Sequence, residues 1–133
     1  MTRDRGDRSA QLRGTARRVT GTDIDAASVR VARENAAINA AAASFRVHDL
    51  RAHSQGLRPG GYDLVFANIL ATPLIDLAEE IRRALRPGGV AILSGLLRSQ
   101  SRSVRAAYLA HGFRAVTRGD IDAWTTLVMT RRV

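Results

Sequence analysis

The strongest constraint on the fold is a regular alternation of short β-rich runs with helical patterns, which begins at Arg17 and continues to the end of the chain. Strands that alternate with helices indicate βαβ units, in which the strands pair in parallel and the helices cover the sheet. The clearest strand is the run Tyr62–Asn68, which is almost continuously apolar, as expected where both faces of a parallel sheet are covered. The sequence therefore predicts an α/β fold with a mostly parallel sheet.

The same patterns predict the other elements. The last two strands should form an antiparallel hairpin, with Asp120 and Asp122 in a longer loop between them. Strands are expected at 18–23, 44–48, 90–94, 113–117 and 123–130, and helices at about 26–40, 73–86 and 101–111.

Capping residues and apolar stripes define the helices. Asp25 suits the N-cap of the first helix, and Gly112 suits the C′ position of the last. Thr72 is expected to cap the middle helix, Pro73 to lie in its first turn, and the glycines after Pro87 to stop it. The expected buried stripes are Val29, Ala32, Ala36 and Asn39 on the first helix, and Leu74, Leu77, Ile81 and Leu85 on the middle one.

The composition suits one compact domain of 133 residues, 45% of them hydrophobic. Cysteine is absent, which excludes disulfides and cysteine-based zinc sites, and no apolar run reaches the roughly 18 residues that span a bilayer. Residues 1–16 are polar and aperiodic, so we expect a disordered leader there and the domain at 17–133. The N-terminus lacks the apolar segment of a secretory signal, and a cytoplasmic location is expected.

The net charge at pH 7 is +9 when histidine is counted as neutral, and all the basic residues in this count are arginines. It fits either a surface that faces nucleic acid or the ribosome, or the codon bias of a GC-rich genome. The arginines are spread along the chain and only 5% of residues are aromatic, so no specific nucleic-acid partner is expected.

Polar residues follow the predicted strands where ligands of such sheets bind. In an open α/β sheet the ligand lies outside the carboxyl ends of the strands. Asp23, Asp49 and Asn68 follow the first three strands, and Ser94-Gly95 follows the fourth. These residues are predicted to line one crevice.

Each of these residues has two readings. Asp23 can accept hydrogen bonds from both ribose hydroxyls of a nucleoside, or act as a second cap for the helix that Asp25 caps. Asp49 can accept from an adenine amino group, or be an ordinary loop acid. Asn68 can orient a nucleophilic amine through its carbonyl, or simply form a turn.

The histidines and Trp124 give weaker indications of a functional site. His48, His53 and His111 have no metal-like spacing with acids or with each other, so no metal site is expected, and His111 suits the end of a helix. Trp124 is expected to pack against the sheet edge, with contact to a substrate as the alternative.

Two segments of the sequence carry a family resemblance. The stretch from Gly21 to Asp25, followed by the Ala32–Ala36 segment and Asn39, resembles the acidic segment of class I methyltransferases. The run from Tyr62 through Asn68-Ile69-Leu70-Ala71, with the later Leu93–Leu97 segment and Gln100, resembles the PrmA family, which methylates protein eleven of the large ribosomal subunit. The resemblance covers about residues 17–132. Relatives that methylate glutamine or nucleic-acid amines carry an Asn-Pro-Pro-aromatic tetrad instead.

The resemblance implies a Rossmann-like sheet and S-adenosyl-L-methionine as the cofactor, whose methyl group is transferred to amino groups of the ribosomal protein. Asp23 matches the ribose-binding acid of the family, and Asn68 matches its asparagine that faces cofactor and substrate. A neutral amine attacks the methyl in line, so catalysis is mainly alignment and desolvation.

The sequence also departs from the family pattern. The family begins its catalytic domain with a central strand and a glycine-rich loop, whereas residues 1–20 hold only Gly6 and Gly14 and no Gly-x-Gly. Loss of that strand would leave a gap or force its two neighbours to pair, and the family's N-terminal recognition domain has no counterpart. We therefore expect a truncated chain with weak or absent cofactor affinity. The alternative function is a catalytically dead fragment or a binding module associated with the ribosome or RNA.

Overall fold

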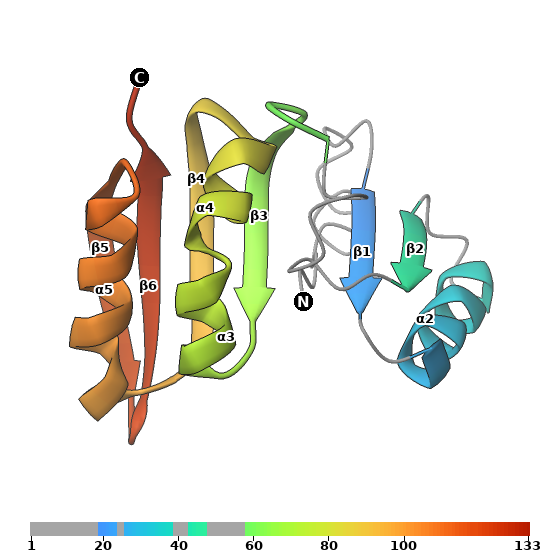
Figure 1. Ribbon diagram of the computed structural model, residues 1–133. Coiled ribbons are helices and arrows are strands. Elements are labelled where there is room, and N and C mark those ends of the chain that lie inside the picture. Colours follow the sequence, from blue (N-terminus) through green and yellow to red (C-terminus); the bar gives the residue numbers. More distant parts are fainter. Residues whose placement is uncertain (1–18, 24–25, 39–42, 48–57) are drawn as a thin grey trace. The chain divides into compact units, whose positions relative to one another are not determined.

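The computed structural model describes residues 19–23, 26–38, 43–47 and 58–133, and Figure 1 labels their elements. The chain divides into two compact units, residues 1–49 and 50–133. Each unit is considered by itself. The predicted leader, 1–16, lies outside the described residues.

The described residues of the first unit form one βαβ element. Strand β1 (Val19–Asp23) is followed by helix α2 (Ala26–Ile38) and by strand β2 (Ala43–Val47). The two strands pair in parallel over their full length, from Val19 opposite Ala43 to Asp23 opposite Val47. Helix α2 buries Val29 and Ala36 of the predicted stripe, while Asp25 and Asn39 lie outside the described residues. The predicted elements of this part are confirmed.

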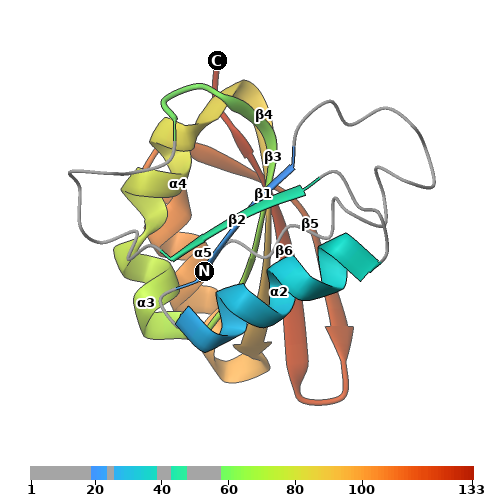
Figure 2. The same ribbon diagram turned by 90° about the vertical axis from the view of Figure 1, so that its right-hand side faces the viewer.

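The second unit is a four-stranded mixed sheet in the order β3-β4-β6-β5. Strands β3 (Tyr62–Asn68) and β4 (Leu85–Leu97) are parallel. Strands β5 (Phe113–Ile121) and β6 (Trp124–Arg131) form an antiparallel hairpin, and β6 is also antiparallel to β4. The predicted α/β fold with a C-terminal antiparallel hairpin is confirmed, but the sheet of this unit is mixed and not mostly parallel, because two of its three ladders are antiparallel. The long hairpin and its turn are visible in Figure 2.

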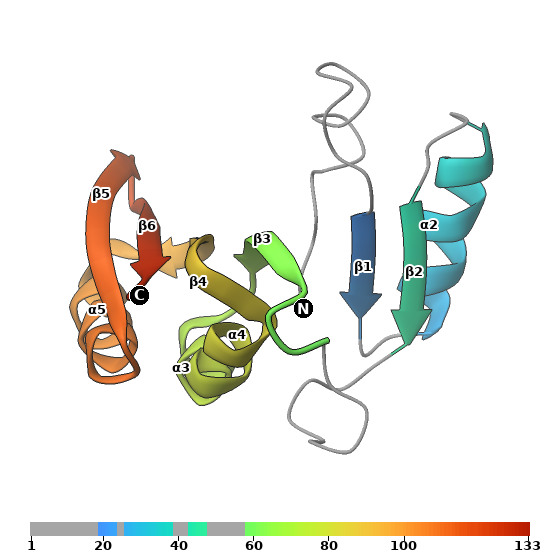
Figure 3. The same cartoon turned by 90° about the horizontal axis from the view of Figure 1, so that it is seen from above.

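Three helices of this unit lie on one face of its sheet, as Figure 3 shows. They are α3 (Ala71–Asp76), α4 (Ala78–Ala84) and α5 (Ser101–Ala110), with the 3-10 turn η2 (Arg98–Gln100) ahead of α5. Between helices and sheet lies one apolar core, in which the rings of Tyr108 and Phe113 pack with centroids 5.1 Å apart. The largest fully buried aliphatic residues there are Leu74, Ile81, Leu85, Leu93, Leu96, Leu127, Met129 and Val104.

The single helix expected at 73–86 is interrupted at Leu77. The carbonyl of Leu74 accepts a hydrogen bond of 2.9 Å from the buried Tyr108 hydroxyl. Tyr108 belongs to α5, and the Leu74 carbonyl that it contacts lies three residues before the interruption at Leu77. Burial of the Tyr108 hydroxyl raises its pKa far above the usual value.

The ends of this helical segment also differ from the prediction. Thr72 is inside α3 and makes no cap, because Leu70 is the N-cap residue, while Pro73 lies in the first turn as predicted. Leu85 is not helical: it begins β4 opposite Tyr62. The spacing of Leu85 from Ile81 fits the apolar stripe of a helix, but Leu85 is buried as the first residue of a strand. The acids Glu79 and Glu80 lie in the first turn of α4 and arginines in its last, which complements the helix dipole.

The hairpin is tighter than expected. Ile121 pairs with Trp124, so only Asp122 and Ala123 form the turn, and Asp122 adopts a positive φ of 53°. Asp120 belongs to β5 and not to the loop. The prediction of a longer loop is therefore wrong, because the strand pairing continues through polar residues that resembled a loop.

The missing central strand of the family, and what its loss does to the neighbouring strands, stay predictions.

Candidate functional site at the carboxyl ends of β3 and β4

The best-defined candidate site begins at Asn68, the last residue of β3. Asn68 lies opposite Ser94 of the parallel strand β4, so the two predicted site segments meet at one edge of the sheet. The Asn68 side chain is partly exposed, and in the described part of the chain its carboxamide has no hydrogen-bond partner. Its carbonyl and amino group are therefore available to a ligand.

Gly95 approaches this carboxamide closely. Its φ is +81°, a left-handed conformation that disfavours residues with a Cβ. A Cβ at this position would lie 2.7 Å from Oδ1 of Asn68 and 3.1 Å from the carbonyl oxygen of Ile69. The glycine is thus required twice, by its backbone conformation and by the space that Asn68 occupies.

A β-bulge explains the conformation of Gly95. Leu93 pairs with Leu127 and Leu96 pairs with Thr125, so β4 advances three residues while β6 advances two. A glycine in the left-handed region is typical of such bulges, which are frequent beside active sites and redirect neighbouring groups. The sequence offered a signal, since an isolated glycine within a strand suggests a bulge. It did not show that this bulge contacts Asn68.

The segment after Asn68 turns the chain from the sheet into α3. Ile69 packs against the core, Leu70 is the N-cap residue and is 74% exposed, and Ala71 starts the helix and is buried. The tetrad that carries the family resemblance is thus the strand-to-helix connection, and it leaves one large apolar side chain on the surface beside Asn68.

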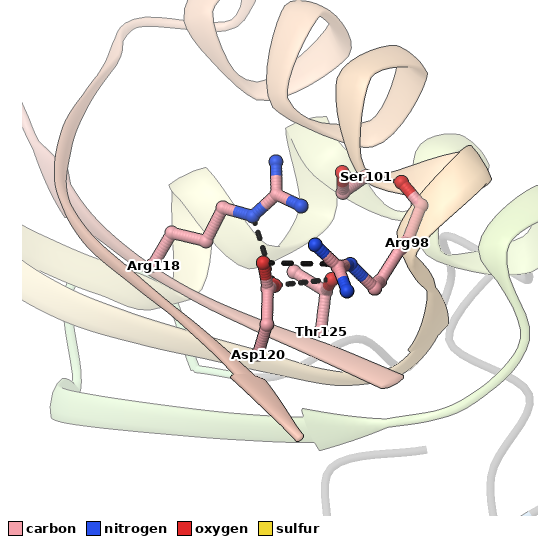
Figure 4. Close-up of polar contacts among 5 residues, drawn as sticks. All are labelled: Arg98, Ser101, Arg118, Asp120 and Thr125. Atoms are coloured by element: carbon pink, nitrogen blue, oxygen red, sulfur yellow. Dashed lines mark hydrogen bonds and ion pairs between the residues drawn. The ribbon is translucent and has the colours of Figure 1, made fainter. Parts of the chain in front are cut away.

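A network around Asp120 holds the hairpin against the end of β4 (Figure 4). The carboxylate accepts hydrogen bonds from Arg118 Nε at 2.9 Å and from the Thr125 hydroxyl at 2.7 Å, and it forms an ion pair with Arg98 Nε at 3.6 Å. The hydrogen bond from Arg118, followed by that from Thr125, lowers the pKa of Asp120. Arg98 also donates its backbone N–H to the Ala123 carbonyl in the turn.

The network fixes a row of exposed apolar side chains. Trp124 pairs with Leu97 on one side and with Ile121 on the other. Their exposed fractions are 55% for Trp124, 38% for Leu97 and 76% for Ile121. The expectation that Trp124 packs against the sheet edge is therefore wrong. Leu97, the last residue of β4, lies two residues after Gly95 in the sequence.

The remaining predicted residues have different outcomes. Asp23 is the last residue of β1, as predicted, but its side chain is outside the described part of the structure. Asp49, His48 and His53 lie outside the described residues altogether. His111 is the C-cap of α5, with Nδ1 2.7 Å from the Ala107 carbonyl oxygen, which agrees with the expected helix-end role.

The described residues have a composition and helix lengths that bear on metal binding and on membrane crossing. They contain no group of three or more histidine, cysteine or acidic residues that could hold a metal ion. No helix within them is long and apolar enough to cross a membrane.

Comparison with known proteins decides the family. The family model described as ribosomal protein L11 methyltransferase (PrmA) matches residues 9–132. The chain belongs to the PrmA family. A PrmA relative from Caulobacter sp. (strain K31), named ribosomal protein L11 methyltransferase, is 52% identical over 122 residues, which are 92% of this chain and 42% of that protein. A relative of the same name from Chelativorans sp. (strain BNC1) is 45% identical, over 85% of this chain and 40% of its own length. The chain thus spans about two-fifths of the curated PrmA relatives it matches.

Solved structures agree with membership of the PrmA family. The crystal structure of a ribosomal protein L11 methylase from Lactobacillus delbrueckii subsp. bulgaricus has a TM-score of 0.78 at 30% identity, over 89% of this chain and 60% of that one. A methyltransferase from Pyrococcus furiosus shares the fold alone, with a TM-score of 0.71 at 19% identity, over 87% of this chain and 64% of its own. The fold is therefore that of class I methyltransferases.

Proposed function

We propose that the chain supplies the amine-facing and ribose-binding residues of an S-adenosyl-L-methionine-dependent protein N-methyltransferase, which acts in the cytoplasm on amino groups of large-subunit ribosomal protein eleven. The close approach of Gly95 to the Asn68 carboxamide is the observation that carries this proposal. It explains why the Asn68–Ala71 tetrad and the Leu93–Leu97 segment, which together resemble the PrmA family, are needed at one place.

The residues of this edge fit the cofactor. Gly95 brings backbone alone beside Asn68 Oδ1, so no side chain of β4 at this position stands between the carboxamide and a ligand. Bound there, the cofactor would supply an electrophilic methyl group on a sulfonium. In this proposal Asp23 accepts hydrogen bonds from the ribose hydroxyls, and Asp49 accepts one from the adenine amino group.

Asn68 would orient the nucleophile. Its carbonyl oxygen accepts an N–H of the neutral substrate amine, which directs the nitrogen lone pair toward the methyl group. No strong base is needed, because the proton can leave to water after transfer. The close approach of Gly95 limits where the carboxamide can lie, and positioning of the amine is the main source of catalysis in this reaction.

The exposed row of Leu97, Trp124 and Ile121 gives the substrate a place to lie. An amine carried on an aliphatic side chain needs apolar contacts along its stem, and an aromatic face provides them while also attracting a cation. We assign this row to the substrate chain, which is the alternative that the sequence left open for Trp124.

We further propose that the 133-residue chain alone binds the cofactor with a Kd weaker than about 100 μM. Residues 1–20 contain no Gly-x-Gly segment. Without such a loop, fewer backbone groups are available to hold the methionine end.

Amide chemical shifts in a titration with S-adenosylhomocysteine, up to about 5 mM, test the proposal at this affinity. We expect shifts at Asn68, Ile69 and Gly95. Asp23→Asn should weaken binding about tenfold or more, because it removes charge from hydrogen bonds to the ribose. Asp76→Asn, an exposed acid of α3, is the matched control and should leave the Kd unchanged. Shifts confined to other regions, or equal Kd values for the two variants, would reject the assignment.

A further inference from the structure

A hollow lies between α5 and the C-terminal hairpin, apart from the site at Asn68. It has a volume of about 440 Å³ and is lined by residues of α5, β5 and β6. Its floor includes Leu127 and Met129, which belong to the core, together with Ala115 of β5. Volumes of this size are typical of small-molecule sites, which combine an apolar floor with a few polar groups. The hollow shares no residue with the site at Asn68 and Gly95.

Three arginines form its rim. Arg102 and Arg105 lie on the same side of α5 at a spacing of three residues, and Arg118 faces them from β5. Like charges at this helical spacing repel each other, so a bound anion would relieve the repulsion. The lining contains no acidic residue.

Among the described residues, one carboxylate forms an ion pair with this rim. Asp120 pairs with Arg118, but it also pairs with Arg98, so one negative charge serves two guanidinium groups (Figure 4). In the described part of the chain, Arg102 and Arg105 have no ion-pair partner. The Ser101 hydroxyl is already used as a donor to the Arg98 carbonyl. The charged hydrogen-bonding groups of the hollow are therefore all cationic, and the Thr117 hydroxyl adds a neutral donor and acceptor.

We infer that this hollow binds a nucleotide, with its phosphate on the rim of Arg102, Arg105 and Arg118 and its base over the Leu127 and Met129 floor. A guanidinium group donates two parallel hydrogen bonds to two oxygens of a phosphate. The three guanidinium groups of the rim offer more donors than one carboxylate can accept. An apolar floor beneath the rim favours a phosphate with a flat organic body over the bare anion, and arginine planes also stack on bases. The nucleotide can be free or part of an RNA chain.

The test is a titration of the full chain, followed by amide shifts, with uridine 5′-monophosphate, inorganic phosphate, hexauridylate and N-acetylglutamate as separate probes. Uridine monophosphate should bind with a Kd below about 1 mM, and inorganic phosphate about tenfold more weakly. The shifts should map to α5 and β5. Tighter hexauridylate binding with a steeper salt dependence would identify an RNA chain as the ligand, and equal binding would identify the free nucleotide.

Two exposed variants locate the phosphate. Arg102→Gln and Arg105→Gln should each weaken uridine monophosphate binding about tenfold, or about 1.4 kcal/mol. Arg114→Gln, an exposed arginine of β5 that does not line the hollow, is the matched control and should have no effect. Circular dichroism confirms that each variant is folded. The inference is overturned if uridine monophosphate does not bind, if all three variants bind equally, or if N-acetylglutamate binds as tightly as the nucleotide.

Discussion

Replacement of Gly95 by alanine should disturb both the stability of the second unit and the position of Asn68. The backbone at φ +81° costs an alanine about 1–2 kcal/mol. The added Cβ would also lie 2.7 Å from Asn68 Oδ1 and 3.1 Å from a backbone oxygen of Ile69, and such overpacking costs about 1–3 kcal/mol. The free energy of unfolding should therefore fall by about 2–5 kcal/mol, measured by urea denaturation.

Two other glycines separate the contributions. Gly60 has a φ of +61° but open space around it, so Gly60→Ala should cost only the conformational share, about 1–2 kcal/mol. Gly119 has neither a positive φ nor a close neighbour, and Gly119→Ala should be neutral or slightly stabilising.

The contact with Asn68 is tested by a double-mutant cycle. Asn68→Ala removes the atom that the new Cβ would meet, so the double variant should be more stable than the sum of the single effects by about 0.5–3 kcal/mol. The reasoning is refuted if Gly95→Ala costs no more than Gly60→Ala, or if the effects of the two substitutions add to within about 0.5 kcal/mol.

Three further predictions concern the fold around the site. Tyr108→Phe removes the donor to the Leu74 carbonyl and should lower stability by about 1–3 kcal/mol in urea, and an unchanged midpoint would contradict a role for that bond. Phe113→Ala empties a fully buried position against Tyr108 and should cost about 3–5 kcal/mol by the same assay, with the exposed Val116→Ala as the control that stays near wild type. Asp120 has a lowered pKa because Arg118 donates to it, so its contribution is present above the ordinary carboxyl pKa of about 3.9 and is lost as pH falls through the folded value. The difference in urea midpoint between wild type and Asp120→Asn should therefore shrink between pH 6 and pH 2, and a constant difference would exclude this pairing.

Local sequence patterns were sufficient to predict the elements whose ends are determined by residues adjacent in the sequence. Strand β3 was predicted with its observed bounds, because an apolar run starts after two glycines and ends at a polar asparagine. The end of α5 was equally clear, since Gly112 takes the positive φ that its C′ position requires.

Long-range contacts account for the errors. The interruption at Leu77 coincides with a hydrogen bond from Tyr108, which is 34 residues away from Leu74 in the sequence. Leu85 has the spacing of a helix stripe, yet its pairing with Tyr62 makes it part of a strand. The tight hairpin turn was hidden because Asp120 and Asp122 are typical loop residues, while the ladder beside them is set by the partner strand.

The site shows the same division. The sequence predicted both Asn68 and Gly95 at strand ends, and the family resemblance predicted the role of Asn68. Their contact depends on the register of β3 with β4 and on a bulge set by β6, which no local pattern contains. Asp23 was correctly placed at the end of β1, while its ribose-binding role stays a prediction.

The most direct measurement is a crystal structure of the chain soaked with S-adenosylhomocysteine at saturating concentration. The account predicts both ribose hydroxyls within about 2.6–3.2 Å of the Asp23 carboxylate, with the sulfur on the side of the Asn68 carboxamide and Gly95. A ligand bound without contact to Asp23, or with its sulfur turned away from Asn68, would contradict it.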